Sequence, residues 1–205
     1  MAEGFTASQP QWKWLEQLQE GWQFGEQGVL MALARRLNVT TCSEIGAGDG
    51  EGLPVTIEPF IKGGLRCTLY EIDETKRARL LERFPHTEIR DKWHIDQLGG
   101  WFWHDLVVID IDGYDWFPFV CVANQRKASC IMVEHADKNI PGSDRLYVPS
   151  MVNATDHRAD GTTGSATEPT LEMMVAGMYT KVGSTRINSV YVRDDRLGLS
   201  HYENF

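Results

Sequence analysis

Residues 40–50 of the chain read TTCSEIGAGDG, a sequence typical of a β-strand followed by a glycine-rich turn. Its first half is a short run that ends on the acid Glu44, as a β-strand would, and its second half begins a series of glycines at positions 46, 48, 50 and 52. Glycine adopts positive φ and lets a ligand approach the backbone closely. A glycine-rich turn after a first strand is the usual cradle of a nucleotide-like ligand. The alternative is an ordinary strand–helix turn that happens to be rich in glycine.

The glycine spacing discriminates between ligands. The dinucleotide fingerprint is G-x-G-x-x-G, but the sixth position counted from Gly46 is Glu51. The pattern is instead acid-x-Gly-x-Gly-x-Gly. Glu71 ends the next expected strand, where a carboxylate can accept both ribose hydroxyls of a nucleoside. Asp73 is its rival for that role.

Two further acids are candidates for contact with the same ligand. Asp91 follows the third expected strand and can accept a hydrogen bond from an adenine amino group; the alternative is a surface turn acid. Asp49 lies within the glycine turn and can approach the amino acid part of a cofactor.

Composition narrows the class of protein. The 205 residues are 42% hydrophobic and 24% charged, typical of one globular domain. The net charge of −9, with Lys and Arg dispersed, argues against a nucleic-acid or anionic-membrane partner. The four cysteines form no Cys-x-x-Cys pair and predict reduced, mostly buried thiols. No signal peptide or membrane span is recognisable, so we expect a cytoplasmic location.

Strand and helix patterns alternate along the chain, which favours a doubly wound α/β sheet with ligands at the carboxyl ends of the strands. We expect a Trp-rich helical leader over 1–25, whose helix at 11–23 either lines a substrate entrance or packs on the main domain. A single domain then covers 26–205. Strands are expected at 40–44, 65–71, 87–90, 105–110 and 129–133, with an antiparallel pair at 179–186 and 189–193, and helices at 26–37, 53–61, 74–84, 117–125 and 165–178.

Two segments of this plan are unusual. In the helix expected at 53–61, Pro54 is placed to open the first turn and Pro59 to shorten or kink the helix. The polar stretch 139–164 has little periodicity, and a loop of that length in a compact domain is more often functional than idle. We expect it to form part of a lid or substrate wall.

Acids and a histidine gather after two strands expected to be neighbours. Asp110 ends the buried run 105–110, Asp112 and Asp115 follow it, and Glu134 and His135 stand at the end of the next strand. Asp110, Asp112 and Glu134 can hold a divalent metal, Mg or Mn, through oxygen ligands. Asp110, Asp112 or His135 can instead act as a base for a hydroxyl nucleophile. The alternative is that one acid contacts the cofactor and the others cap the next helix.

These motifs, taken in order, resemble class I S-adenosylmethionine-dependent methyltransferases over about residues 26–195. The subgroup that the chain most resembles is the FkbM-type and allied, largely uncharacterised, methyltransferase-like proteins. Their strand-end pattern Asp-x-Asp/Glu-Gly-x-Asp/Glu is matched by Asp110, Asp112, Gly113 and Asp115. The resemblance implies a Rossmann-like, mostly parallel seven-stranded sheet with an antiparallel last strand. It implies S-adenosyl-L-methionine bound by Glu44, Gly46, Ala47, Gly48, Asp49, Gly50, Glu71, Ile72 and Asp91.

The function that this resemblance implies is methyl transfer, by an O-methyltransferase, to a hydroxyl of a small molecule or sugar. The alternative is a non-catalytic S-adenosylmethionine-binding or partner subunit on the same fold. An NAD-dependent oxidoreductase is disfavoured by the glycine spacing and by the absence of an obvious Tyr-x-x-x-Lys pair. We expect a small-molecule substrate, no nucleic acid and no membrane as partners; the sequence leaves a homo-oligomer open.

Overall fold

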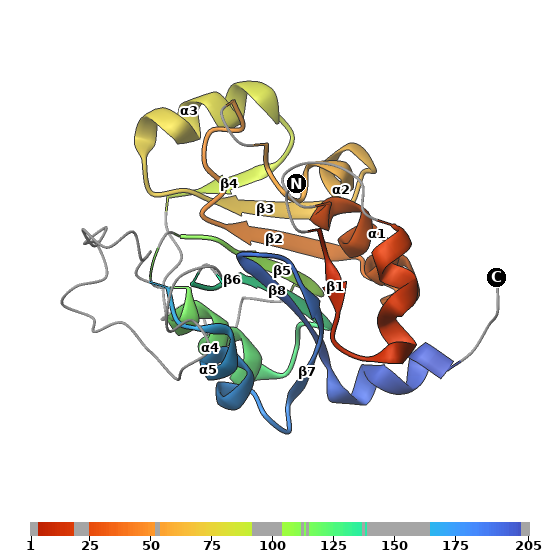
Figure 1. Cartoon of the computed structure of the whole chain (residues 1–205). Helices are drawn as coiled ribbons and strands as arrows, with labels where there is room; N and C mark the ends of the chain where they lie inside the picture. The colour runs from red at the N-terminus through yellow and green to blue at the C-terminus, as the bar shows by residue number, and fades with distance from the viewer. Residues whose placement is uncertain are drawn as a thin grey trace.

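The structure is a computed structural model that describes residues 4–18, 25–51, 54–91, 104–111, 113, 115–136, 138 and 165–201. Strands and helices alternate along most of the chain, as the sequence predicts (Figure 1). The elements are β1 (Thr6–Ala7), η1 (Pro10–Gln17), α1 (Glu26–Leu37), β2 (Thr41–Ile45), α2 (Glu58–Lys62), β3 (Arg66–Tyr70), α3 (Glu74–Arg83), β4 (Glu88–Arg90), β5 (Leu106–Ile109), α4 (Trp116–Gln125), β6 (Cys130–Glu134), α5 (Glu168–Met174), β7 (Tyr179–Ser184), β8 (Asn188–Arg193) and η3 (Asp194–His201).

All described strands join one sheet in the order β1-β7-β8-β6-β5-β2-β3-β4. Strands β4, β3, β2, β5 and β6 are parallel to one another, whereas β8 runs antiparallel to both β6 and β7. The mostly parallel, doubly wound sheet with an antiparallel last strand is therefore confirmed. The sheet has eight strands rather than the expected seven, because the sequence did not predict β1, a two-residue strand that pairs antiparallel with β7.

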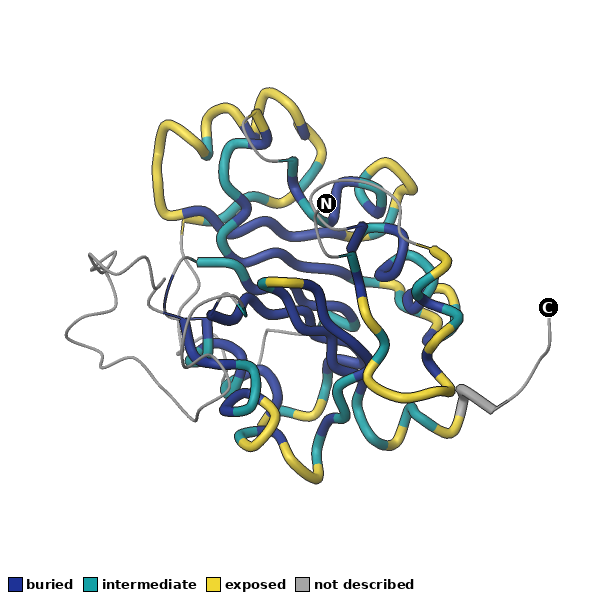
Figure 2. The backbone as a smooth tube through the Cα atoms, in the orientation of Figure 1, coloured by how far each residue is buried: buried dark blue, intermediate teal, exposed yellow. Residues whose placement is uncertain are grey.

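Helices cover both faces of the sheet, so the molecule has three layers (Figure 1). One face packs against α1, α2 and α3 and contains the larger apolar core; α4 and α5 cover the other face and its smaller core. Strands β5 and β6 are buried along their whole length, and β2 is buried from Cys42 to Ile45 (Figure 2). This explains the near-continuous apolar sequences of β5 and β6, because a parallel strand between two helical layers has no solvent face. Among the described residues, no helix combines the length and apolar character needed to span a bilayer.

The N-terminal segment packs into the larger core. Phe5, Trp12 and Leu15 are buried there, with η1 in place of part of the helix expected at 11–23. Trp14 is half-buried, with the guanidinium of Arg36 5.4 Å from its ring centre. Of the two roles expected for the tryptophans, packing on the main domain is therefore the one that Trp12 has, since it is only 1% exposed.

The helix expected at 53–61 is shorter and begins later than predicted. Only α2, five residues long, forms in this region, and Pro54 precedes it in non-helical backbone. Pro59 opens the helix instead, because it lies in the first turn, where no intrahelical N–H donor is needed. The helix expected at 165–178 is also shorter than predicted. It is α5, which begins at Glu168, has Pro169 in its first turn and ends at Met174. The chain between the glycine turn and α2 is therefore mostly irregular in its described part.

We expect Trp12→Ala to lower the free energy of unfolding by about 3–5 kcal/mol, the usual cost of truncating a buried aromatic side chain. Trp14→Ala, in the same element but half-buried, is the matched control and should cost clearly less. Urea denaturation of both variants checks this. Equal costs would mean that η1 does not pack as a part of the core.

Candidate functional site

The glycine turn lies where the carboxyl ends of β2, β3 and β5 meet. The backbone N–H groups of Gly46 and Ala47 both donate to the carbonyl of Tyr70, at 2.9 and 3.1 Å, which fastens the turn to the end of β3. Gly46 has a φ of +88°, and a Cβ there would overlap the backbone carbonyl of Asp110. Glycine is therefore required at 46 because the turn crosses directly over the end of β5.

Gly48 serves a different purpose. Its φ is +63°, and a Cβ built on it would meet nothing within 4 Å, so the backbone here faces open space. Its N–H donates to Oε2 of Glu71 at 2.9 Å, and the other carboxylate oxygen of Glu71 accepts from the N–H of Asp73 at 2.9 Å. Each carboxylate oxygen has a second lone pair, so Glu71 retains capacity for two more donors beside the open space.

The other acids predicted to contact the cofactor lie in different surroundings. Asp73, the rival of Glu71, accepts from the N–H of Lys76 at 3.0 Å and caps α3. Ile72 is 78% exposed between them. Asp91 is exposed directly after β4, and Asp49 forms an ion pair with Arg79 at 2.7 Å. Glu71 is thus the carboxylate whose two oxygens are fixed next to the glycine turn.

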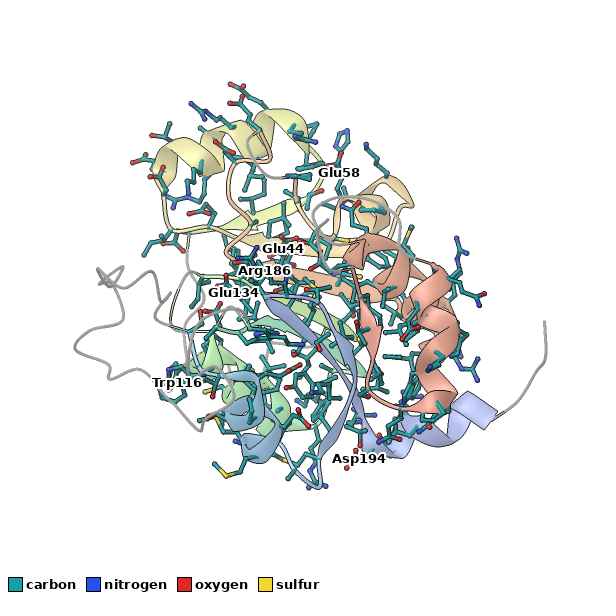
Figure 3. The ribbon with its side chains drawn as sticks, in the orientation of Figure 1. Glu44, Glu58, Trp116, Glu134, Arg186 and Asp194 are labelled. Atoms are coloured by element: carbon teal, nitrogen blue, oxygen red, sulfur yellow. The ribbon has the colours of Figure 1, made fainter. Side chains whose placement is uncertain are left out.

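Glu44 is almost fully buried below the turn, at 3% exposure (Figure 3). Its two oxygens accept from the N–H groups of Thr56 and Ile57, at 3.0 and 2.9 Å. Burial raises the pKa of Glu44 to about 7, although these backbone hydrogen bonds oppose the shift. The carboxylate therefore anchors the irregular segment before α2, through contacts that the sequence did not reveal.

Three carboxyl groups meet after β5 and β6. One oxygen each of Asp110, Asp115 and Glu134 lies within 4.8 Å of the others (Figure 3 labels Glu134). Two of them, Asp110 and Glu134, are residues that the sequence proposed as metal ligands. Oxygen donors in such a group suit a hard divalent cation. The third proposed ligand, Asp112, lies outside the described residues, as does the loop 139–164.

Asp115 shapes the turn that carries Asp110. Its carboxylate accepts from the N–H of Ile111 at 2.7 Å and from that of Gly113 at 2.9 Å, and it is completely buried. Burial raises its pKa to about 6. The hydroxyl of Ser165, from the segment before α5, lies 3.3 Å from Asp115 and 3.4 Å from Glu134. The sequence alternative counted Asp115 among the acids that cap the next helix. It lies at the N-cap position of α4, but its side chain makes no capping hydrogen bond there. Nothing in the sequence pointed to Ser165.

The structure does not bring His135 into this acid group. The ring is completely buried, and its Nδ1 lies 2.8 Å from the carbonyl of Ala136, so Nδ1 carries the proton. Nε2 is buried without a hydrogen-bond partner. Burial lowers the pKa of His135, which keeps the ring neutral. His135 directly follows Glu134, the last residue of β6, and its N–H still pairs with the carbonyl of Ile187. Successive side chains of such extended backbone point to opposite faces of the sheet.

The chain is similar to known proteins in its three-dimensional structure. No family model matches the chain, and no curated protein matches it. An O-methyltransferase from Bacillus cereus, solved in complex with S-adenosylhomocysteine, is similar at 14% identity with a TM-score of 0.53, over 91% of this chain and 92% of that chain. A Klebsiella pneumoniae protein to which O-methyltransferase activity has been ascribed is similar at 14% identity and a TM-score of 0.55, over 91% and 90%. The chain therefore has the Rossmann-like fold of class I methyltransferases.

The raised pKa of Glu44 predicts a pH dependence of stability. A carboxyl group with a raised pKa holds its proton more tightly in the folded chain, so it favours folding below its ordinary pKa of 4.5 and loses this contribution as the pH rises to about 7. We expect the free energy of unfolding of the parent, relative to Glu44→Gln, to fall over that range. Urea denaturation of both proteins across this pH range checks it. A difference that does not change with pH would contradict the assignment.

Proposed function

We propose that the chain binds S-adenosyl-L-methionine and transfers its methyl group to a hydroxyl of a small molecule or sugar. The observation that carries the proposal is the open backbone at Gly48 beside the two fixed oxygens of Glu71. The likeness to methyltransferase structures supports it through the fold, in which ligands bind at the carboxyl edge of the sheet.

In this proposal the glycine turn and Glu71 hold the nucleoside half of the cofactor. Glu71 has two unused lone pairs that suit the two ribose hydroxyls, and Ile72, which is 78% exposed, offers an apolar surface beside them. Gly48 leaves room for the ligand against the backbone. Asp49 and Asp91 stay candidates for the amino acid part and the adenine, respectively. Glu44 acts indirectly, because its carboxylate is occupied by Thr56 and Ile57.

The bound cofactor supplies a methyl group on a sulfonium that is already activated. The work left to the protein is to align the acceptor hydroxyl and remove its proton. We propose that Asp110, which is half-buried directly after β5, is the base that removes this proton. Asp112 is the second candidate. His135 is a weaker candidate because its free Nε2 is fully buried.

A divalent metal, Mg²⁺ or Mn²⁺, fits the acid group. The cluster offers three carboxylates to a hard cation. Asp115 is the least available, because both of its oxygens accept backbone N–H groups. As the alternative to Asp110 acting as the base, we propose Asp110 and Glu134 as the principal ligands of such a metal, with Asp115 orienting the turn after β5. A bound cation would orient an acceptor hydroxyl and lower its pKa.

The second candidate function is a non-catalytic S-adenosylmethionine-binding or partner subunit. The burial of His135 favours it modestly, since one expected base is withdrawn from solvent. Methyl transfer is preferred because Asp110 remains accessible next to two further carboxyl groups. The FkbM-type subgroup stays a proposal, based on the strand-end sequence pattern of Asp110, Asp112, Gly113 and Asp115.

Gly48→Val should abolish binding of S-adenosylhomocysteine, because the added side chain fills the open space that the ligand needs. Gly64→Val is the matched control: Gly64 also has a positive φ, +78°, and open space around its Cβ, but lies before β3. Both variants carry a backbone strain of about 1–2 kcal/mol. Isothermal titration calorimetry should show binding for Gly64→Val alone; normal binding by Gly48→Val would refute the cofactor assignment.

Asp110→Asn keeps the shape of the side chain and removes its charge. We expect methyl transfer to an acceptor, identified from a library of hydroxylated small molecules, to fall by roughly 10²-fold or more, while S-adenosylhomocysteine still binds. If the acid group holds a metal, Mn²⁺ binding measured by electron paramagnetic resonance should also weaken, and chelator should inhibit the parent. Parent-like turnover by this variant, with or without chelator, would exclude both roles of Asp110.

A further inference from the structure

Helix α3 lies beside the glycine turn (Figure 1). Two of its arginines, Arg79 and Arg83, contact the turn. Arg77 donates to the carbonyls of Glu71 and Ile72, at 2.9 and 2.6 Å. Arg79 and Arg83 are four residues apart and therefore share one face of the helix. That face meets the part of the turn that continues past Gly48.

Arg79 and Arg83 hold three consecutive residues of the turn. The Nη1 atom of Arg79 lies 2.7 Å from the carboxylate of Asp49 and 3.2 Å from that of Glu51. Arg83 donates through Nη1 to the carbonyl of Gly50 and through Nη2 to Glu58 at 2.8 Å. The two nitrogens of one guanidinium thus join the glycine turn to the first residue of α2.

These contacts matter because the turn is followed by irregular backbone. A helix that started directly after the glycines would fix the turn through its own hydrogen bonds, but α2 starts only at Glu58. In the described part of the segment, the backbone is held by Glu44 from below and by the arginines of α3 from the side. The position of the turn therefore depends on side chains from another element.

We propose that Arg83, assisted by Arg79, is a positioning residue for cofactor binding: it holds residues 49–51 so that the backbone at Gly48 stays open to the ligand. This inference rests on the proposed function, because the ligand concerned is S-adenosylmethionine. Arg83 is the stronger of the two, since its partner Glu58 has a side chain that is only 11% exposed. Arg79 is 46% exposed and its ion pairs are open to screening by salt.

The test compares Arg83→Ala with Arg193→Ala. Arg193 has the same pattern of contacts, donating to the carbonyls of Arg126 and Lys127 and pairing with Asp195, but it lies at the end of β8, away from the glycine turn. We expect Arg83→Ala to weaken S-adenosylhomocysteine binding at least tenfold by calorimetry, and Arg193→Ala to leave it within about twofold of the parent. Arg83→Lys, which cannot span both partners of the guanidinium, should recover only part of the loss.

Hydrogen exchange provides a readout that needs no ligand. Arg83→Ala should speed the exchange of the backbone amides of residues 49–51 and 55–57, whereas Arg193→Ala should not. For Arg79→Ala we expect a smaller loss of affinity that disappears in 1 M salt, where charges are screened within about 3 Å.

The outcomes separate this inference from the proposed function. Failure of the parent itself to bind S-adenosylhomocysteine would overturn the proposed function and the positioning role together. If the parent binds and Arg83→Ala binds equally well, the positioning role alone is wrong. Equal weakening by Arg83→Ala and Arg193→Ala would also overturn it, because the effect would then be a general loss of stability.

Discussion

The crossing of the glycine turn over the end of β5 is the constraint on which the rest of the site depends. Gly46 sits so close to the carbonyl of Asp110 that no side chain fits between them. The backbone N–H groups of Gly46 and Ala47, which begin the turn, both donate hydrogen bonds to the carbonyl of Tyr70 at the end of β3. One close backbone approach therefore fixes the turn, Glu71 and Asp110 relative to one another. The geometry of the proposed cofactor contacts and of the proposed reaction site therefore depends on this close approach of Gly46 to Asp110.

Side chains from other elements hold the segment that follows the glycine turn. Glu44 lies below the turn with both oxygens committed to backbone N–H groups, while arginines of α3 hold the turn from the side. A carboxylate that is desolvated in this way is costly unless its hydrogen bonds are complete. The irregular backbone before α2 is thus coupled to the strand that starts the fold. In a typical strand–turn–helix unit, main-chain hydrogen bonds of the helix would do this work.

The sequence predicted the fold well because its signals are local. Apolar runs such as 105–110 and the alternation of strands and helices suffice for the order of the central elements. It could not predict β1, whose two residues gain their strand conformation by pairing with β7. Nor did it predict the start of α2. Both Pro54 and Pro59 suit the first turn of a helix, and the sequence does not show that Pro59 takes that place. At the site, strand ends identified Glu71, Asp110 and Glu134, but Ser165 and Arg83 reach it from distant segments and leave no pattern in the sequence.

The central claim is that the carboxyl edge of the sheet holds S-adenosylmethionine between the glycine turn and Glu71. A crystal structure of the chain grown with S-adenosylhomocysteine tests it most directly. The account predicts ligand density against the backbone of Gly48, with both ribose hydroxyls within hydrogen-bond distance of the Glu71 carboxylate. Ligand density elsewhere on the molecule, or an edge that stays empty at saturating ligand, would contradict it.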